Sequence, residues 1–243
     1  MDPARMMSVV RNNLLFDQPF WAHIGFGLEL IADPTCDAGW TDGIHLAYNP
    51  AYIAKGTLEE AAGLFVEECG HNVFGHIWRM HGLDKEDANR AADLALFPII
   101  NKIPGCSIPK ELFDPVKDAW CEGKYLEFIY SHIRQQRQEG GGGEPGDDQN
   151  QGGNGPKEDK AGGDGQDKGK GKDKQGKAPG ELPNGRSELR EPPPEKIPEL
   201  KAKWEQLVME AYQVAKEAGN VPAGIEQLVE KIAHPKVNYK IKM

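Results

Sequence analysis

The chain has 243 residues, of which 38% are hydrophobic and 28% are charged, and it carries a formal net charge of -9. This acidic balance excludes a general nucleic-acid-binding surface, which would be basic. The sequence shows neither an apolar run of about 18 residues, the length that a membrane span needs, nor a signal-peptide pattern at its start. Four cysteines without a C-x-x-C pair are typical of a reducing compartment. We therefore expect a cytoplasmic protein with no membrane contact and no strong affinity for nucleic acid.

Composition divides the chain into three parts. Residues 1–138 have the mixed apolar and polar pattern of a globular domain. Residues 139–195 consist almost entirely of Gly, Asp, Lys, Glu, Gln and Pro. Such a segment has too little apolar surface to offset its ordering entropy, so we predict a disordered linker. Order is expected to return over residues 196–243.

The first part predicts an α+β domain. A helix over residues 14–26, interrupted near Pro19, comes first. Residues 28–31 and 44–48 have the composition of short strands, and residues 41–43 read as the turn that leads into the second strand. These strands predict a small hairpin or sheet.

Two longer helices should follow. Thr57 and Glu60 have the spacing of a capping box, which predicts a helix that runs through His71 to about Met80. Asp84 is a suitable N-cap for the next helix, which should continue through Asp93 toward residue 97.

A pair of amphipathic helices is expected after the linker. Pro198 suits the first turn of the earlier helix, and residues 219–220 should end it. Apolar residues recur at helical spacing in both helices: Leu200, Trp204, Leu207, Val208, Ala211 and Ala215, then Ile225, Leu228, Val229 and Ile232. Two helices of this size cannot form a core alone, so we expect them to dock on the first domain or on a partner.

The segment 67–71, Glu-Glu-Cys-Gly-His, has the spacing of the zinc-hydrolase motif H-E-x-x-H with the first His replaced by Glu67. On a helix, Glu67 and His71 lie one turn apart with Cβ atoms about 6 Å apart, and both side chains can bind zinc. Glu68 stands where the motif has its general base. The alternative is a solvated surface pair of Glu67 and His71.

Three further polar residues belong to this prediction. His76 lies on the opposite face from Glu67 of a straight helix, so it is a core histidine, an outer-sphere partner or an alternate ligand if Gly75 breaks the helix. Asn89 and Asp93 share one face of the next helix, where they can supply a ligand and a residue that orients it. Asp93 stands in an apolar run, where a carboxylate needs a partner. The alternative for Asp93 is a surface acid.

The motifs together resemble the zincin-like metallopeptidase domain that precedes a von Willebrand A-like domain in bacterial and phage proteins. The resemblance covers about two-thirds of the chain. It is carried by residues 16–20, 38–43, 46–50 (L-x-Y-N-P), 67–76, 89–93 (N-x-A-x-D) and 123–130 (G-x-x-x-E-x-I-Y). It implies a zinc ion bound by Glu67, His71 and Asp93, with Glu68 activating a water that attacks a peptide bond.

The sequence also departs from the family pattern. Glu67 replaces a zinc-binding His, Ala88 a Trp and Phe97 an Asn, and the sequence ends where the family continues into its von Willebrand A-like domain. A second carboxylate lowers the net charge of the metal centre and should make its water less acidic. The alternatives are therefore an inactive relative that binds a peptide or protein partner, or a scaffold that assembles through its linker and terminal helices. The resemblance also implies a separate von Willebrand A-like partner protein.

Overall fold

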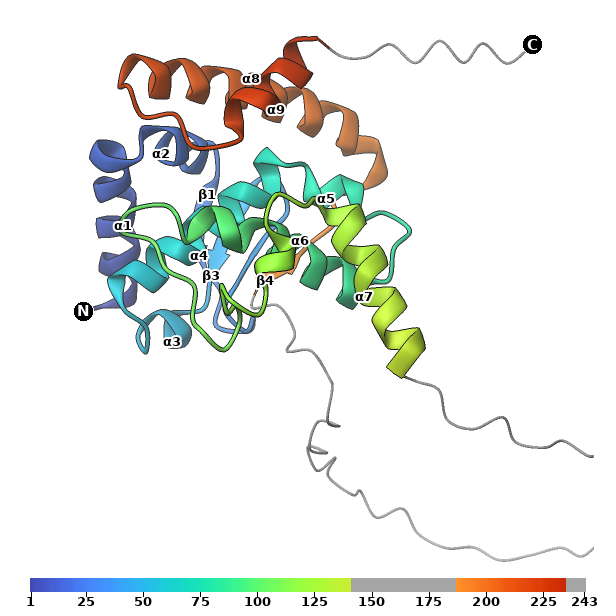
Figure 1. Ribbon diagram of the computed structural model, residues 1–243. Helices are drawn as coiled ribbons and strands as arrows, with labels where there is room; N and C mark the ends of the chain where they lie inside the picture. The colour runs from blue at the N-terminus through green and yellow to red at the C-terminus, as the bar shows by residue number, and fades with distance from the viewer. Residues whose placement is uncertain (141–186, 235–243) are drawn as a thin grey trace, which may run out of the picture.

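A computed structural model describes residues 1–140 and 187–234 (Figure 1). The helices are α1 (Pro3–Asp17), α2 (Pro19–Phe26), α3 (Pro50–Ile53), α4 (Leu58–Val73), α5 (His76–Arg79), α6 (Lys85–Ile100), α7 (Leu126–Gly140), α8 (Ile197–Glu217) and α9 (Ile225–Ala233), with 3-10 turns η1 (Ala119–Cys121) and η2 (Pro194–Lys196). The strands are β1 (Glu29–Ala32), β2 (Gly39–Thr41), β3 (His45–Tyr48) and β4 (Ser187–Leu189). The α+β prediction is confirmed. Residues 141–186, most of the predicted linker, lie outside the described part.

The strands form one sheet in the order β1-β3-β2-β4. β1 and β3 are parallel, β2 is antiparallel to β3, and β4 is parallel to β2. β1 and β3 match the two predicted strands to within one residue. β2 was missed, because its three residues lie beside and within the segment read as a turn. β4 is a correction, because residues 187–189 were expected to be part of the disordered linker.

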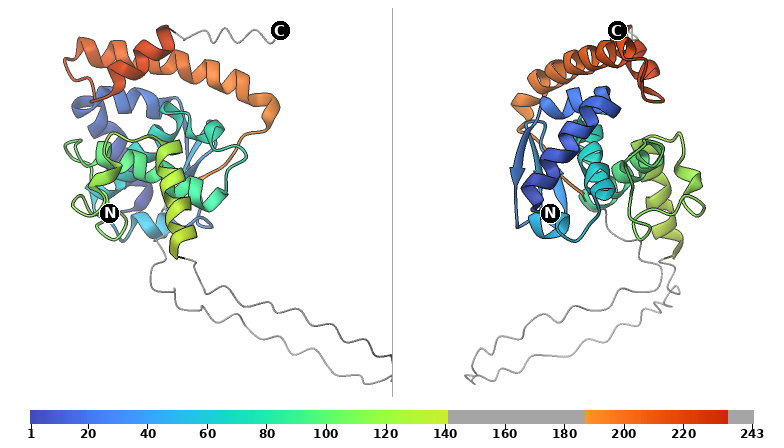
Figure 2. Two further views of the ribbon diagram at one scale, coloured as in Figure 1. Left: turned by 45° about the vertical axis from the view of Figure 1, so that its right-hand side comes forward. Right: turned by 90° about the vertical axis from the view of Figure 1, so that its left-hand side faces the viewer.

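Helix α4 lies between the sheet and α6 (Figure 2, right). Its predicted capping box is present: the Glu60 amide donates to Thr57 Oγ1 at 3.1 Å, and the Thr57 amide donates to Glu60 Oε2 at 2.8 Å. All residues from 61 to 73 of α4 are buried. Because both sides of α4 are covered, polar side chains on it face the protein interior.

Helix α4 is shorter than predicted, and α1 is longer. The predicted helix to Met80 ends at Val73, because Gly75 adopts the left-handed conformation with a φ of 67° and the chain restarts as α5. At the other end of the domain, α1 begins at Pro3 rather than near residue 14. Its N-cap Asp2 accepts a hydrogen bond from the Arg5 amide at 3.0 Å.

The two C-terminal helices contact the rest of the described structure. α8 packs along α2 and reaches α4, and α9 packs on α8 (Figure 1). Trp204 is 1% exposed, and its Nε1 donates to the carbonyl oxygen of Gly43 at 3.0 Å. Gly27 permits close contact at the end of α2, since a Cβ there would lie 2.3 Å from Leu207 Cδ2. Of the apolar positions predicted for α8, Leu207 alone is only partly buried.

None of the helices in residues 1–140 and 187–234 combines the length and the apolar character that crossing a bilayer requires.

Candidate metal centre

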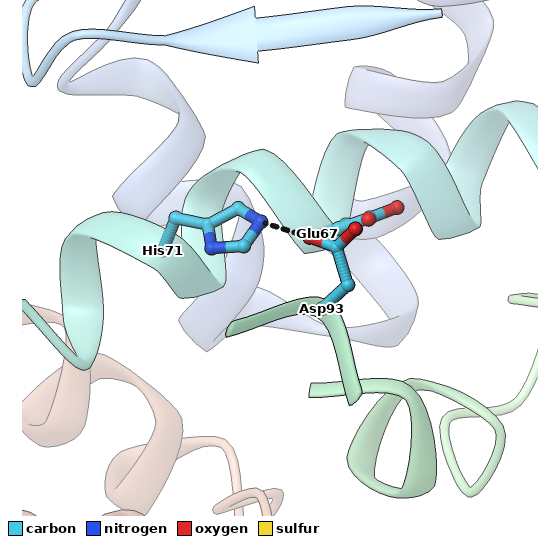
Figure 3. A group of neighbouring side chains, drawn as sticks. All are labelled: Glu67, His71 and Asp93. Atoms are coloured by element: carbon cyan, nitrogen blue, oxygen red, sulfur yellow. Dashed lines mark ion pairs between the residues drawn. The ribbon is translucent and has the colours of Figure 1, made fainter. Parts of the chain in front are cut away.

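Glu67, His71 and Asp93 meet in the interior (Figure 3). All three have 0% of their surface exposed. One possible ligand atom from each lies within 4.8 Å of the other two. His71 Nε2 lies 3.3 Å from Asp93 Oδ1. The structure thus brings together the three residues that the sequence nominated as ligands.

Two helices supply these side chains. Glu67 and His71 stand one turn apart on α4, and Asp93 comes from the middle of α6. The helices approach closely at Gly70, where a Cβ would lie 2.9 Å from Leu96 Cδ2. The missing side chain at position 70 therefore sets the spacing that lets the Asp93 carboxylate reach His71.

Glu68 follows Glu67 on α4, and its carboxylate faces the sheet. Its side chain is fully buried. A Cβ added to Gly39 of β2 would lie 2.8 Å from Glu68 Oε1. The backbone of β2 therefore runs directly against the carboxylate that the motif assigns as general base.

A hydrogen bond between Asn72 and Thr41 connects α4 to β2. The sequence analysis did not identify either residue. Asn72 Nδ2 donates to Thr41 Oγ1 at 2.9 Å and to the carbonyl oxygen of Glu68 at 2.8 Å. Thr41 Oγ1 donates to the carbonyl oxygen of His45 at 2.8 Å. The signal in the sequence was weak: a polar residue next to His71 that would be buried with it.

His76 contacts the triad through His71. The left-handed Gly75 turns the chain back, so that His76 Nδ1 lies 3.1 Å from His71 Nδ1. Burial, followed by the nearness of His71 and Arg79, holds the pKa of His76 well below 6.5, so this ring is neutral at pH 7. A metal-bound nitrogen carries no proton, so His71 would bind metal through Nε2 and donate from Nδ1 to His76. This geometry suits an orienting partner of His71.

Asn89 lies one turn before Asp93 on α6 and contacts β4. Its Oδ1 accepts a hydrogen bond from the Leu189 amide at 2.9 Å. This bond engages the side-chain oxygen of Asn89, the atom that could otherwise bind a metal ion. The residue that the sequence proposed as an orienting or alternate ligand therefore joins α6 to a strand from the far end of the chain.

The donor set fits a divalent metal ion. Zinc binds His nitrogen and carboxylate oxygen at about 2.0–2.2 Å, which places two donors of a tetrahedral site about 3.4 Å apart. The His71–Asp93 distance of 3.3 Å already matches that spacing. Two carboxylates and one imidazole would balance the charge of the ion and leave a fourth position for water or substrate.

Solvent comes near the centre from the side of His76. A pocket of about 580 Å³ lies between α5, α6, the start of α7 and α9, and its lining includes His76, Leu96, Tyr125 and Leu228. His76 is only 2% exposed and separates this pocket from His71. The centre itself is closed to solvent in this conformation.

Comparison with known proteins agrees with the geometry. A protein-family profile described as "Putative metallopeptidase domain" matches residues 5–243, a range that contains every residue of the centre. Neither the curated proteins nor the solved structures contain a match to the chain.

Proposed function

Because the chain belongs to the family described as "Putative metallopeptidase domain", we propose that it is a zinc-dependent hydrolase of peptide bonds. The observation that carries this proposal is the convergence of Glu67, His71 and Asp93 from two helices. Glu68 is buried at the next position of α4 after Glu67. Two carboxylates and one imidazole would hold the ion, and Glu68 would accept a proton from the attacking water.

Each residue has a separate task in this proposal. A bound zinc ion would polarise the peptide carbonyl and favour loss of a proton from an attacking water. Glu68 accepts that proton and returns it to the leaving nitrogen. His76 fixes the orientation and tautomer of His71. Asn72 and Thr41 hold α4 at a fixed distance from β2, next to which a peptide could lie.

Metal content is the first test. We expect the purified chain to contain about one zinc ion per molecule, as measured by elemental mass spectrometry. The Glu67→Ala, His71→Ala and Asp93→Ala variants should each lose this zinc. Glu59→Gln is the matched control, because Glu59 lies on the same helix but is exposed. A chain that takes up no metal, even from excess zinc, would contradict the proposal.

Hydrolysis is the second test. Glu68→Gln keeps the size of the side chain but removes its basicity, so we expect normal zinc content and at least a 100-fold loss of cleavage of a fluorescently labelled unfolded protein. Glu59→Gln should cleave like the original chain. Zinc binding without cleavage in any variant, the original included, would instead support the alternative of an inactive binding module.

A further inference from the structure

Strand β4 covers the side of the centre on which Glu68 lies. It pairs with β2, the strand that touches the Glu68 carboxylate, and it contacts both α4 and α6. Gly39, whose Cβ position would lie 2.8 Å from Glu68 Oε1, is opposite Ser187 in the register of the two strands. Neighbouring strands lie about 4.8 Å apart. The backbone of β4 thus runs within one strand spacing of the residue that packs on the general base.

Two successive backbone amides at the end of β4 donate hydrogen bonds, one to β2 and one to α6. On one side the Arg190 amide donates to the carbonyl oxygen of Thr41 in β2 at 3.0 Å. On the other side the Leu189 amide donates to Asn89 Oδ1 at 2.9 Å, one turn from Asp93 on α6. An extended segment therefore spans the space between the sheet and the ligand-bearing helix.

Successive side chains at the end of β4 lie on opposite sides, with Glu188 exposed and Leu189 buried. Leu189 is 0% exposed and packs in an apolar cluster with Ile77, Met80, Ala88, Ala92 and Leu126. Glu188 points outward and reaches Lys85 at 3.1 Å. One leucine-sized pocket next to the centre is therefore filled by the chain itself.

Arg190 occupies a second, polar position. Its guanidinium lies 3.7 Å from the centre of the Trp40 ring, and its Nη2 lies 3.5 Å from Asp33 Oδ2. Hydrogen bonds from the side chains of Thr35 and Trp40 lower the pKa of Asp33 to about 2, so this carboxylate is charged at neutral pH. A stacked and paired guanidinium is a specific arrangement that lysine does not reproduce.

We propose that β4 occupies the site in which an extended peptide substrate binds, and that such a substrate carries a leucine-like residue followed by arginine. This rests on the proposed function. The incoming peptide would add to the edge of β2 in the direction of β4, hydrogen-bond to Thr41 and Asn89, and fill the Leu189 and Arg190 positions. Backbone pairing with a sheet edge supplies affinity, and the two side-chain positions supply specificity.

The proposal requires β4 to leave without unfolding the domain. β4 contains only three residues. The contacts that flank Leu189 at the surface, Lys85 with Glu188 and His81 with Glu191, are exposed ion pairs, which contribute little stability. A strand this short, at the edge of the sheet, can open locally at a lower free energy than the buried helices α4 and α6.

Hydrogen exchange on the full, unmodified chain tests this opening. We expect the amides of Leu189 and Arg190 to exchange at least about tenfold faster than the amides in the middle of α4, although both are hydrogen-bonded. Exchange at the rate of α4 would show that β4 opens only with the whole domain, and it would overturn the proposal.

Binding of a peptide in trans tests the occupant. A labelled peptide with the sequence of residues 186–192 should bind a Leu189→Ala, Arg190→Ala double variant at least tenfold more tightly than it binds the original chain, whose own strand competes. Glu195→Ala, an exposed change just after β4, is the matched control and should behave like the original chain. A peptide in which the same leucine and arginine are alanine should not bind the double variant.

These measurements are made in the presence of a chelator, so they do not depend on zinc or on cleavage. A folded double variant, verified by circular dichroism, that fails to bind the peptide would overturn the proposal even if the chain proves to be a zinc hydrolase. Conversely, peptide binding by a chain that takes up no zinc would leave the strand-addition site standing and refute the hydrolase.

Discussion

Glu67 gives the candidate centre a second carboxylate at a position where H-E-x-x-H motifs have an imidazole. The structure buries this carboxylate fully, within ligand distance of His71 and Asp93. A second anion adds affinity for a divalent cation but reduces the positive charge that acts on the attacking water. In the proposed hydrolase, Glu67 would therefore strengthen metal binding and weaken the activation of water.

We predict that Glu67→His increases hydrolysis. Removing one negative charge from the centre makes loss of a proton from the attacking water easier, so kcat/KM should rise about tenfold, and the pH below which activity is lost should move downward. Measuring kcat/KM against pH, with zinc content checked in parallel, tests this. An unchanged profile at full zinc occupancy would show that Glu67 does not act on the centre.

His76 contacts His71 of the candidate centre. We predict that His76→Ala weakens zinc affinity about 10- to 100-fold, because His71 loses the partner that fixes its ring. His76→Asn should recover part of the affinity, since its side-chain oxygen can accept the same hydrogen bond. His23→Ala, at a partly exposed histidine on α2, is the control. Equal zinc affinity in all four proteins, measured by chelator competition, would disprove this role.

At the scale of elements, the sequence predicted α2, α4, α6, α8 and α9, but it missed α7 and most of α1. The capping box at Thr57 placed the start of α4 correctly, because it depends on residues close together in the chain. The spacing of Glu67 and His71 indicated two candidate ligands for the same reason, because both lie on one helix. The approach of Asp93 depends on how tightly α6 packs at Gly70, which no local pattern encodes.

The short strands depend on distant partners and were missed for that reason. β2 and β4 have three residues each, and β4 follows a stretch whose composition predicts disorder. Residues 187–189 are extended because they pair with Thr41 and its neighbours, more than 140 positions earlier in the chain. A pattern of hydrophobic residues cannot reveal a strand in which a single buried leucine, Leu189, follows an exposed glutamate.

The turn between α4 and α5 provides a prediction with a matched pair of glycines. Gly75 and Gly82 both have positive φ, 67° and 78°, but of the two only Gly75 has a close neighbour, since a Cβ there would lie 2.6 Å from Trp78 Nε1. Both Gly→Ala variants should lose about 1–2 kcal/mol of unfolding free energy from backbone strain, and Gly75→Ala more. Only Gly75→Ala should also lower zinc affinity, because it displaces His76. Denaturant unfolding and chelator competition measure the two effects; equal zinc affinities would separate the turn from the centre.

At the scale of the whole molecule, the N-terminal part and the C-terminal helices share one apolar core. Trp204 and Val208 of α8 belong to the same cluster of buried residues as Phe20 and Ile24 of α2 and Phe65 of α4. This shared cluster is the contact through which the C-terminal pair would dock on the first domain. If it holds in solution, the two parts should unfold together.

Trp204→Ala provides the test. We predict a loss of about 3–5 kcal/mol in the free energy of unfolding, since the variant removes a fully buried indole and its hydrogen bond to Gly43. Trp204→Phe keeps most of the apolar volume and should lose considerably less, while Lys201→Ala, at an exposed position of α8, should change little. Urea unfolding followed by circular dichroism should give a single transition that shifts as a whole. Two separate transitions, of which Trp204→Ala shifts only a first, small one, would show that α8 and α9 unfold independently of the rest of the chain. In that case β4 would have to remain paired with β2 without support from the C-terminal helices.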